Sequence, residues 1–134
     1  CTLVAGAQGA DPAGYFIRPT VFTDVHPRMP VFRDEIFGPV LSTITFKDQA
    51  EAVKLGNDTI YGLAAAVWTS DINKAFKTSA ALRAGVVWVN CFDNGHISSP
   101  FGGFKQSGFG RDKALHALDG YTQLKTTWID LSDA

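Results

Sequence analysis

The side chains of this sequence that could act as a nucleophile or a base are Cys91 and a loop histidine, His96. Cys91 follows an apolar stretch, where a lone cysteine is more typical of a small buried side chain than of a nucleophile. His96 lies in a polar, glycine-rich segment and needs a partner before it can act as a general base. Cys1 and Cys91 fit neither a disulfide framework nor a zinc-ligand spacing, which favours a reducing compartment and, by default, the cytoplasm.

A phosphate-binding loop is not present in the sequence. Gly108-Phe109-Gly110 continues with Arg111 and has no third glycine, and no Gly-Lys-Ser/Thr occurs. A Ser/His/Asp arrangement with a nucleophile elbow is missing as well. The chain therefore has no self-contained nucleotide fingerprint.

Glu35 is a more informative residue because it precedes Phe37-Gly38-Pro39. A carboxylate beside an aromatic ring can accept hydrogen bonds from ribose hydroxyls while the ring packs on a flat heterocycle. The alternative is an exposed acid in a turn, and composition alone favours that alternative.

Three strands and two helices must position these side chains. Residues 40–46, 63–69 and 86–90 have the β-branched or apolar content of strands, and the last shows no alternation, as expected of a strand covered on both faces. Asp48 and Glu51 predict a capping box for a helix that ends near Asn57. Ser70 is the predicted cap of a second helix, which Gly85 ends. This alternation predicts an α/β fold with a parallel, doubly wound sheet.

The flanking segments are less regular. We expect residues 1–14 to form the end of a strand that runs into a loop. Residues 15–25 are expected to form an edge strand, because Pro19 has no backbone N–H to donate to a sheet. A non-helical stretch is expected to follow, up to Pro39. Residues 91–110 form a long glycine-rich loop at the carboxyl end of a buried strand, where ligands bind in open α/β sheets. A short helix over 111–118 and a final strand over 121–131 complete the chain.

Composition limits the possible partners. The chain has 134 residues, 46% of them hydrophobic, and a net charge of -1, which suits one ordinary domain and argues against nucleic acid as a partner. No apolar run approaches the roughly 20 residues of a membrane span, so no membrane partner is expected. Because the chain begins with Cys1 and an apolar pair, we expect a piece of a longer polypeptide.

Four blocks of sequence carry a family resemblance. They are Glu35-Ile36-Phe37-Gly38-Pro39-Val40, Asn57 with Tyr61-Gly62-Leu63-Ala64-Ala65, Trp88-Val89-Asn90, and Pro100-Phe101-Gly102-Gly103-Phe104-Lys105-Gln106-Ser107-Gly108 with Gly110-Arg111. In order and spacing they resemble the C-terminal signatures of NAD(P)-dependent aldehyde dehydrogenases. Residues 112–129 look most like the γ-glutamyl-γ-aminobutyraldehyde and other ω-amino-aldehyde members of that family.

The resemblance implies that this chain is the C-terminal part of an oxidoreductase. In that family a Cys attacks the aldehyde, and hydride transfer to NAD or NADP leaves a thioester on that Cys. A Glu then activates the water that hydrolyses the thioester. Of the two coenzymes, NAD is favoured for this chain. Those catalytic residues lie upstream of Cys1, so none is assigned in this chain, which is expected to be inactive by itself. Its partners would be the remainder of the same polypeptide and a small aldehyde.

The resemblance also implies roles for seven residues of this chain. Glu35 would bind the nicotinamide ribose and Phe37 would lie beside the nicotinamide. Phe101 would form a wall of the aldehyde pocket, with Asp93 and His96 at its mouth. Backbone carbonyls near two further residues, Lys105 and Gly108, would hold a monovalent cation.

Three positions depart from the family pattern. Gly95 replaces an aromatic residue of some relatives, which would open the pocket. His96 replaces an acid that is common in amino-aldehyde relatives, and an imidazole does not attract a cationic substrate. Gln123 replaces a Glu of the subunit-joining arm, so a neutral hydrogen bond would replace an ion pair there.

The same resemblance predicts the organisation of the chain. Residues 1–120 would belong to the catalytic domain, and residues 121–134 would form an oligomerisation strand and tail of a homodimer or homotetramer. The alternative is a free-standing, non-catalytic α/β module that serves in assembly or weak ligand binding; the intact mass of the source protein separates the two.

Overall fold

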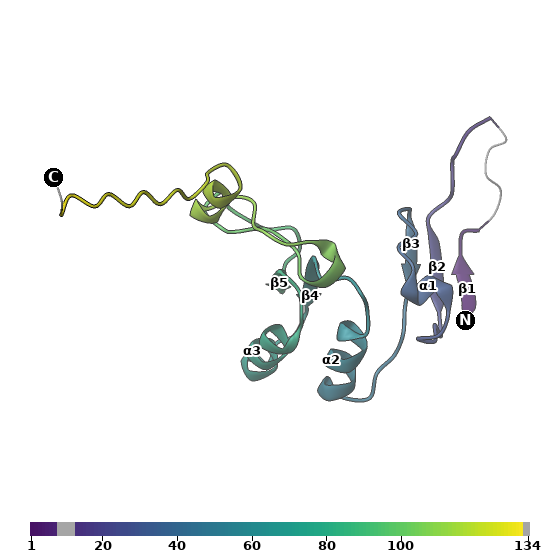
Figure 1. The fold of residues 1–134 in the computed structure, drawn as a ribbon. Coiled ribbons are helices and arrows are strands. Elements are labelled where there is room, and N and C mark those ends of the chain that lie inside the picture. Colours follow the sequence, from purple (N-terminus) through teal and green to yellow (C-terminus); the bar gives the residue numbers. More distant parts are fainter. Residues whose placement is uncertain (8–12, 133–134) are drawn as a thin grey trace. The chain divides into compact units, whose positions relative to one another are not determined.

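The computed structural model describes residues 1–7 and 13–132, which form two compact units, Cys1–Thr59 and Ile60–Ala134 (Figure 1). Each unit has a small sheet of its own. The elements alternate between strands and helices, so the predicted α/β class is confirmed.

The first unit contains a three-stranded sheet of β1 (Thr2–Ala5), β2 (Thr20–Thr23) and β3 (Val40–Ser42). The order is β1-β2-β3, with β1 antiparallel and β3 parallel to β2. The predicted edge strand is therefore wrong: β2 is central, and it starts immediately after Pro19, so the ring that lacks a donor stays outside the ladder. The predicted strand end near the N-terminus is confirmed by β1, whereas the loop expected over residues 8–12 lies outside the described residues.

Two helices complete the first unit. α1 (Pro30–Arg33) interrupts the stretch predicted to be non-helical; its first residue is a proline, which needs no donor there and has φ preset for a helix. α2 (Gln49–Asn57) begins as predicted, because the Asp48 carboxylate accepts a hydrogen bond from the Glu51 amide at 2.9 Å. The Glu51 carboxylate in turn accepts from the Lys47 amide at 2.7 Å.

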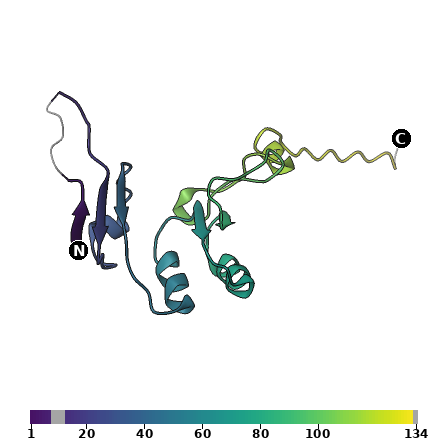
Figure 2. The same ribbon diagram turned by 180° about the vertical axis from the view of Figure 1, so that it is seen from behind.

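The second unit is a strand–helix–strand element of β4 (Ala64–Val67), α3 (Ile72–Ala81) and β5 (Val86–Val89), seen from behind in Figure 2. β4 and β5 are parallel, and Ala64 pairs with Val86 at one end and Val67 with Val89 at the other. The predicted parallel pairing is thus confirmed here. The strand over 40–46, however, pairs with β2 rather than with β4, so the described strands form two sheets instead of one.

Both ends of α3 differ from the prediction. Asp71, not Ser70, is the N-cap: its Oδ1 accepts hydrogen bonds from the amides of Asn73 and Lys74 at 2.9 and 3.1 Å. The helix ends at Ala81, and Leu82 already has extended backbone angles. Gly85 is not left-handed and has a different role, described below.

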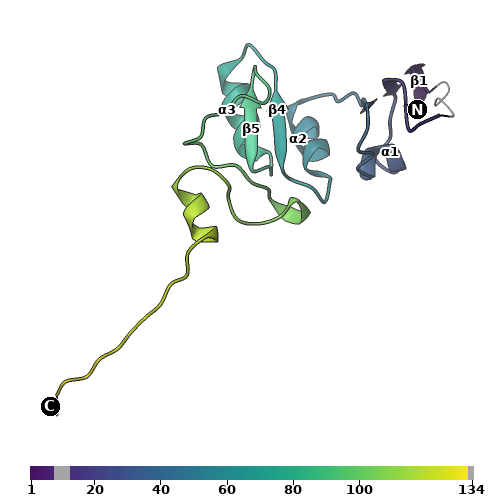
Figure 3. The same cartoon turned by 90° about the horizontal axis from the view of Figure 1, so that it is seen from above.

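The C-terminal part contains two short 3-10 helices, η1 (Lys105–Ser107) and η2 (Leu115–Gly120). The second replaces the helix predicted over 111–118. The chain after η2 extends away from that helix and forms no strand pairing over residues 122–131 (Figure 3). The strand predicted over 121–131 is not formed within the described chain, because a strand needs a hydrogen-bonding neighbour.

Burial is sparse in both units. Among the described residues, Val25 and Ala75 are the buried hydrophobic side chains, and Thr20 is the buried polar one. Large apolar side chains such as Phe16, Trp68 and Trp128 are exposed. No helix in the described ranges is long and apolar enough to cross a membrane.

The cap of α3 yields a prediction on stability. Asp71→Ala should lower the free energy of unfolding of the complete protein by about 1 kcal/mol, because two amides of the first turn lose their acceptor. Ser70→Ala is the matched control and should leave it unchanged. Urea unfolding of both variants measures the difference, and equal destabilisation by the two changes would contradict the assignment of the cap.

Candidate functional site

Glu35 and Phe37 lie in the loop between α1 and β3 of the first unit, and both side chains are exposed. The loop is held at its start by the Asp34 amide, which donates to the Pro30 carbonyl at 2.8 Å. It is held at its end by the Thr20 amide, which donates to the Pro39 carbonyl at 2.8 Å. The two candidate residues thus occupy a short segment with fixed ends.

Phe37 has an unusual backbone. Its φ is +54°, in the left-handed region that bulky residues avoid, and its ring is 93% exposed. Such strain persists where the surroundings fix the chain, and it is common at binding sites. The exposed ring and the Glu35 carboxylate, whose two oxygens accept hydrogen bonds, belong to the same short loop. Residues of these types suit a flat heterocycle joined to a ribose diol, as in a nicotinamide nucleotide.

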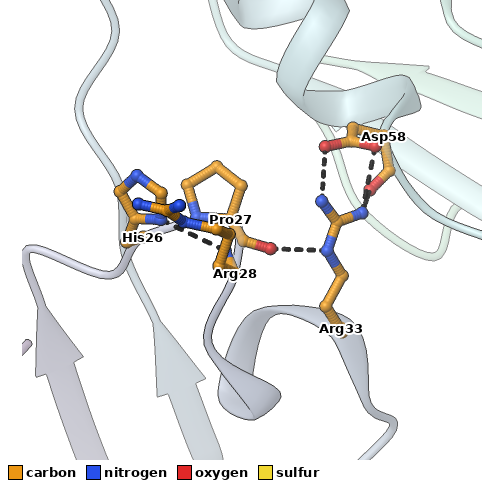
Figure 4. A network of polar contacts seen from close by, with 5 residues as sticks. All are labelled: His26, Pro27, Arg28, Arg33 and Asp58. Atoms are coloured by element: carbon orange, nitrogen blue, oxygen red, sulfur yellow. Dashed lines mark hydrogen bonds and ion pairs between the residues drawn. The ribbon is translucent and has the colours of Figure 1, made fainter.

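A charged clamp holds α1 against the end of α2 (Figure 4). The Arg33 guanidinium donates from Nη1 to Asp58 Oδ1 at 3.0 Å and from Nη2 to Oδ2 at 2.8 Å. Nη1 also donates to the Asp58 carbonyl at 2.9 Å, and Nε donates to the Pro27 carbonyl. The hydrogen bonds to Asp58 raise the pKa of Arg33. Sequence reasoning missed this pair because its partners are 25 residues apart and no local pattern links them.

The other five candidate residues belong to the second unit, on the segment that follows β5. Asn90, the first residue after β5, has a φ of +55° and joins the two strand ends. Its Oδ1 accepts from the Thr69 amide at 2.8 Å, and its Nδ2 donates to the Thr69 carbonyl at 2.9 Å. The segment therefore leaves the carboxyl edge of the parallel pair, as predicted. Cys91 comes next as a half-buried, free thiol.

Asp93 and His96 lie in a loop that Trp88 anchors. The indole Nε1 of Trp88 donates to the Asn94 carbonyl at 2.6 Å, and its ring lies 5.2 Å from that of Phe92. Asp93 has a φ of +52°. The His96 Nδ1 accepts from the Ser98 amide at 3.3 Å and lies 2.9 Å from the Ser98 hydroxyl, so this nitrogen faces the loop itself.

Phe101 is placed by a backbone bridge. Its amide donates to the Asp112 carbonyl at 2.8 Å, and the Asp112 amide donates back at 2.6 Å. The Lys113 ammonium lies 5.5 Å from the centre of the Phe101 ring. A groove beside this residue is also lined by Leu63, Phe109, Arg111, His116 and Tyr121. The Ala114 amide donates to the Ile97 carbonyl at 2.8 Å, so the stretches 97–101 and 112–114 lie side by side.

Four glycines allow close approaches between backbone segments in this part of the second unit. A Cβ on Gly85 would overlap the carbonyl oxygen of Gly102, and one on Gly62 would lie 2.7 Å from the Arg83 carbonyl oxygen. Cβ atoms on Gly102 and Gly103 would lie 2.6 Å from Gly110 and Ser107 atoms. The Gly62 amide also donates to the Ser107 hydroxyl at 3.0 Å, and its carbonyl accepts from Phe104 at 2.8 Å. The loop is thus fixed by backbone contact.

Lys105 and Gly108 bracket η1, with φ values of +54° and +106°. The Lys105 carbonyl accepts from the Gly108 amide at 3.3 Å. No group of three or more His, Cys, Asp or Glu side chains that could hold a metal occurs in the described ranges. Of the seven candidate residues, Phe37, Asp93 and Lys105 have a positive φ that residues other than glycine rarely adopt, so three of them have strained backbone. Gly108 adopts its positive φ without strain because it has no Cβ.

Comparison with known proteins gives consistent matches. Residues 1–127 match the aldehyde dehydrogenase family. Aminoacetaldehyde dehydrogenase of Pseudomonas aeruginosa is 54% identical over 125 residues, 92% of this chain and 25% of the relative. NADP/NAD-dependent aldehyde dehydrogenase PuuC of Escherichia coli is 53% identical over 115 residues, 86% of this chain and 23% of the relative.

A solved structure agrees. The P. syringae AldA indole-3-acetaldehyde dehydrogenase, in a complex with NAD+, has a TM-score of 0.89 and 55% identity and covers 97% of this chain and 27% of its own. The chain spans about a quarter of the length of the curated relatives it matches.

The glycine contacts generate a second prediction. Gly85→Ala should destabilise the complete protein by about 1–3 kcal/mol, because the added methyl group must displace the backbone of Gly102. Gly95→Ala is the matched control, since no atom lies within 4 Å of the position that its added methyl group would take. Thermal and urea unfolding of both variants test this, and a neutral Gly85→Ala would show that the loop is not held by this contact.

Proposed function

Because the chain belongs to the aldehyde dehydrogenase family, we propose that the complete protein oxidises an aldehyde to a carboxylic acid with NAD or NADP. The match over residues 1–127 carries this proposal, and it agrees with the resemblance of the four sequence blocks. The reaction passes through a thioester formed on a Cys, and a Glu activates the water that hydrolyses it. Both belong to the remainder of the polypeptide.

The first unit contributes the coenzyme side. The Glu35 carboxylate accepts hydrogen bonds from the nicotinamide ribose hydroxyls and orients that end of the coenzyme, while the Phe37 ring packs beside the nicotinamide. The bound coenzyme supplies a hydride acceptor. NAD is favoured, with support from relatives whose names or complexes include NAD.

The second unit contributes the aldehyde side. Phe101 forms an apolar wall, and Asp93 and His96 contact the distal end of the substrate at the mouth of the pocket. The names of the relatives include an amino aldehyde and an aromatic one, aminoacetaldehyde and indole-3-acetaldehyde. We therefore assign the choice between charged and aromatic aldehydes to this loop, where Gly95 leaves room and His96 brings no negative charge.

Assembly and ion binding complete the proposal. Residues 1–120 belong to the catalytic domain, and residues 121–134 join a second subunit of a homodimer or homotetramer, whose edge supplies the missing strand partner. Backbone carbonyls near Lys105 and Gly108 hold a monovalent cation. The protein works in the cytoplasm, in keeping with free thiols at Cys1 and Cys91.

The coenzyme side is tested by aldehyde-dependent formation of NADH or NADPH. The complete protein should be active, and Glu35→Gln should weaken coenzyme positioning by about 1–3 kcal/mol, because an amide replaces a charged acceptor. Asp34→Asn is the matched control: the same change one residue earlier should leave turnover and the coenzyme KM unchanged. If Glu35→Gln matches the wild type in kinetics and stability, Glu35 does not bind coenzyme.

The aldehyde side is tested by Phe101→Ala. Loss of the aromatic wall should reduce transition-state binding by about 1.5–3 kcal/mol, which is at least a tenfold fall in kcat/KM for aldehyde. Phe46→Ala, a change of the same size at an exposed residue of the first unit, serves as the control and should leave kcat/KM unchanged. If kcat/KM stays constant over a panel of aliphatic, aromatic and amino aldehydes, the aldehyde pocket lies elsewhere.

A further inference from the structure

We propose that Arg33 and Asp58 are positioning residues for the coenzyme loop, here defined as residues 34–38; this rests on the proposed role of Glu35. The observation behind it is the clamp in Figure 4, in which the guanidinium of Arg33 contacts two other segments and so links three segments of the first unit. These are the turn at Pro27, the end of α1 and the residue that caps the end of α2.

The clamp acts at the start of the coenzyme loop. Arg33 is the last residue of α1 and stands two residues before Glu35. α1 is a single turn of four residues, and a helix this short has little stability of its own. Its orientation, and with it the direction in which the loop leaves, therefore depends on contacts to its neighbours. These include the hydrogen bonds of Arg33 to Asp58 and Pro27, and that of the Ser42 hydroxyl to the Val31 carbonyl at 2.9 Å.

The far end of the coenzyme loop is fixed by a different element. The Pro39 carbonyl accepts a hydrogen bond from the Thr20 amide of β2 at 2.8 Å, and Val40 pairs with Thr20 in the sheet. With the clamp at one end and the sheet at the other, five residues must span a set separation. Phe37 keeps its left-handed backbone under this constraint, and strained backbone persists only where both sides are held.

The shape of the guanidinium matters more than its charge. Arg33 and Asp58 make two parallel hydrogen bonds, and the third and fourth contacts use the same planar group. A lysine ammonium has no such fork. The side chains are 41% and 48% exposed, so the pair contributes little to global stability and its effect should be local.

The experiment measures coenzyme affinity of the complete enzyme by fluorescence titration with NAD and NADP. Arg33→Ala and Asp58→Ala should each raise the Kd by about twofold to fivefold, in keeping with an exposed bidentate pair. The double variant should match Arg33→Ala, because that change already removes every contact of the clamp, including the hydrogen bonds to the Pro27 and Asp58 carbonyls that Asp58→Ala leaves. Arg33→Lys and the isosteric Asp58→Asn, which preserve most of the side-chain volume, should show the same direction of change.

Controls separate the clamp from a general loss of charge or of structure. Arg28→Ala removes the same charge from the same segment and should leave the Kd unchanged. The aldehyde KM should also stay constant in every clamp variant, because the aldehyde residues lie in the second unit. A rise in coenzyme Kd alone, at an unchanged melting temperature, supports positioning over a merely structural role.

Glu35→Gln in the same titration distinguishes the two levels of the proposal. If it weakens coenzyme binding while Arg33→Ala, Arg33→Lys and Asp58→Asn do not, the clamp is a surface ion pair and the inference is overturned, whereas the proposed function stands. If Glu35→Gln has no effect, the role of Glu35 fails and the inference fails with it. Additive effects of Arg33→Ala and Asp58→Ala would also overturn it.

Discussion

The direct approach of two backbone segments at glycine is the constraint on which the second unit depends. Gly85 directly precedes β5, and a Cβ there would overlap the carbonyl oxygen of Gly102. Gly62 lies shortly before β4, and a Cβ there would lie 2.7 Å from the Arg83 carbonyl oxygen and 3.1 Å from the Cβ of Phe104. The Gly62 carbonyl accepts hydrogen bonds from the amides of Phe104 at 2.8 Å and Gly85 at 3.0 Å, which join these segments. The contact at Gly102 also fixes the position of Phe101, because Phe101 directly precedes Gly102 and Gly103 in the chain.

Few side chains of the described residues are buried, so contacts between backbone segments are important in holding the loops in place. Val25 and Ala75 are the buried apolar residues of the described chain, one in each unit. An α/β element normally buries both faces of its parallel strands, yet every residue of β5 is only half-buried and Phe76 of α3 is 70% exposed. Those apolar surfaces fit a chain whose core is completed by further polypeptide, as the proposed complete enzyme would provide.

Local rules predict the elements of this chain well and their ends less well. The capping box at Asp48 and the strands around Val40, Ala64 and Val86 follow from patterns within a few residues. Ser70 and Asp71 are both good caps, and only the geometry of the first turn decides for Asp71. Sheet membership could not be predicted, because pairing between β2 and β3 joins segments separated by α1 and its flanking turns.

For the candidate residues too, local sequence motifs identify the residues but not the distant residues that they contact. Its residues are found through motif resemblance, and the structure adds what a motif cannot contain: the partners that hold them. Gly85 resembles a helix stop because glycine commonly ends helices, whereas its actual neighbour, Gly102, is 17 positions away. Asn90 could have been noticed, since asparagine after a strand tolerates a positive φ and can bond to backbone.

The two groups of candidate residues, one in each unit, are held by interactions of different physical kinds. The loop of Glu35 depends on an exposed ion pair, whose strength falls as salt screens it over a Debye length of about 8 Å at physiological ionic strength. The segment of Phe101 depends on steric contact between backbones, which salt does not weaken. The proposed support of the Glu35 loop is therefore sensitive to ionic strength, whereas the support of Phe101 is not. In the proposed enzyme, which would release one coenzyme molecule and bind another in every cycle, the salt-sensitive support would belong to the segment where that exchange occurs.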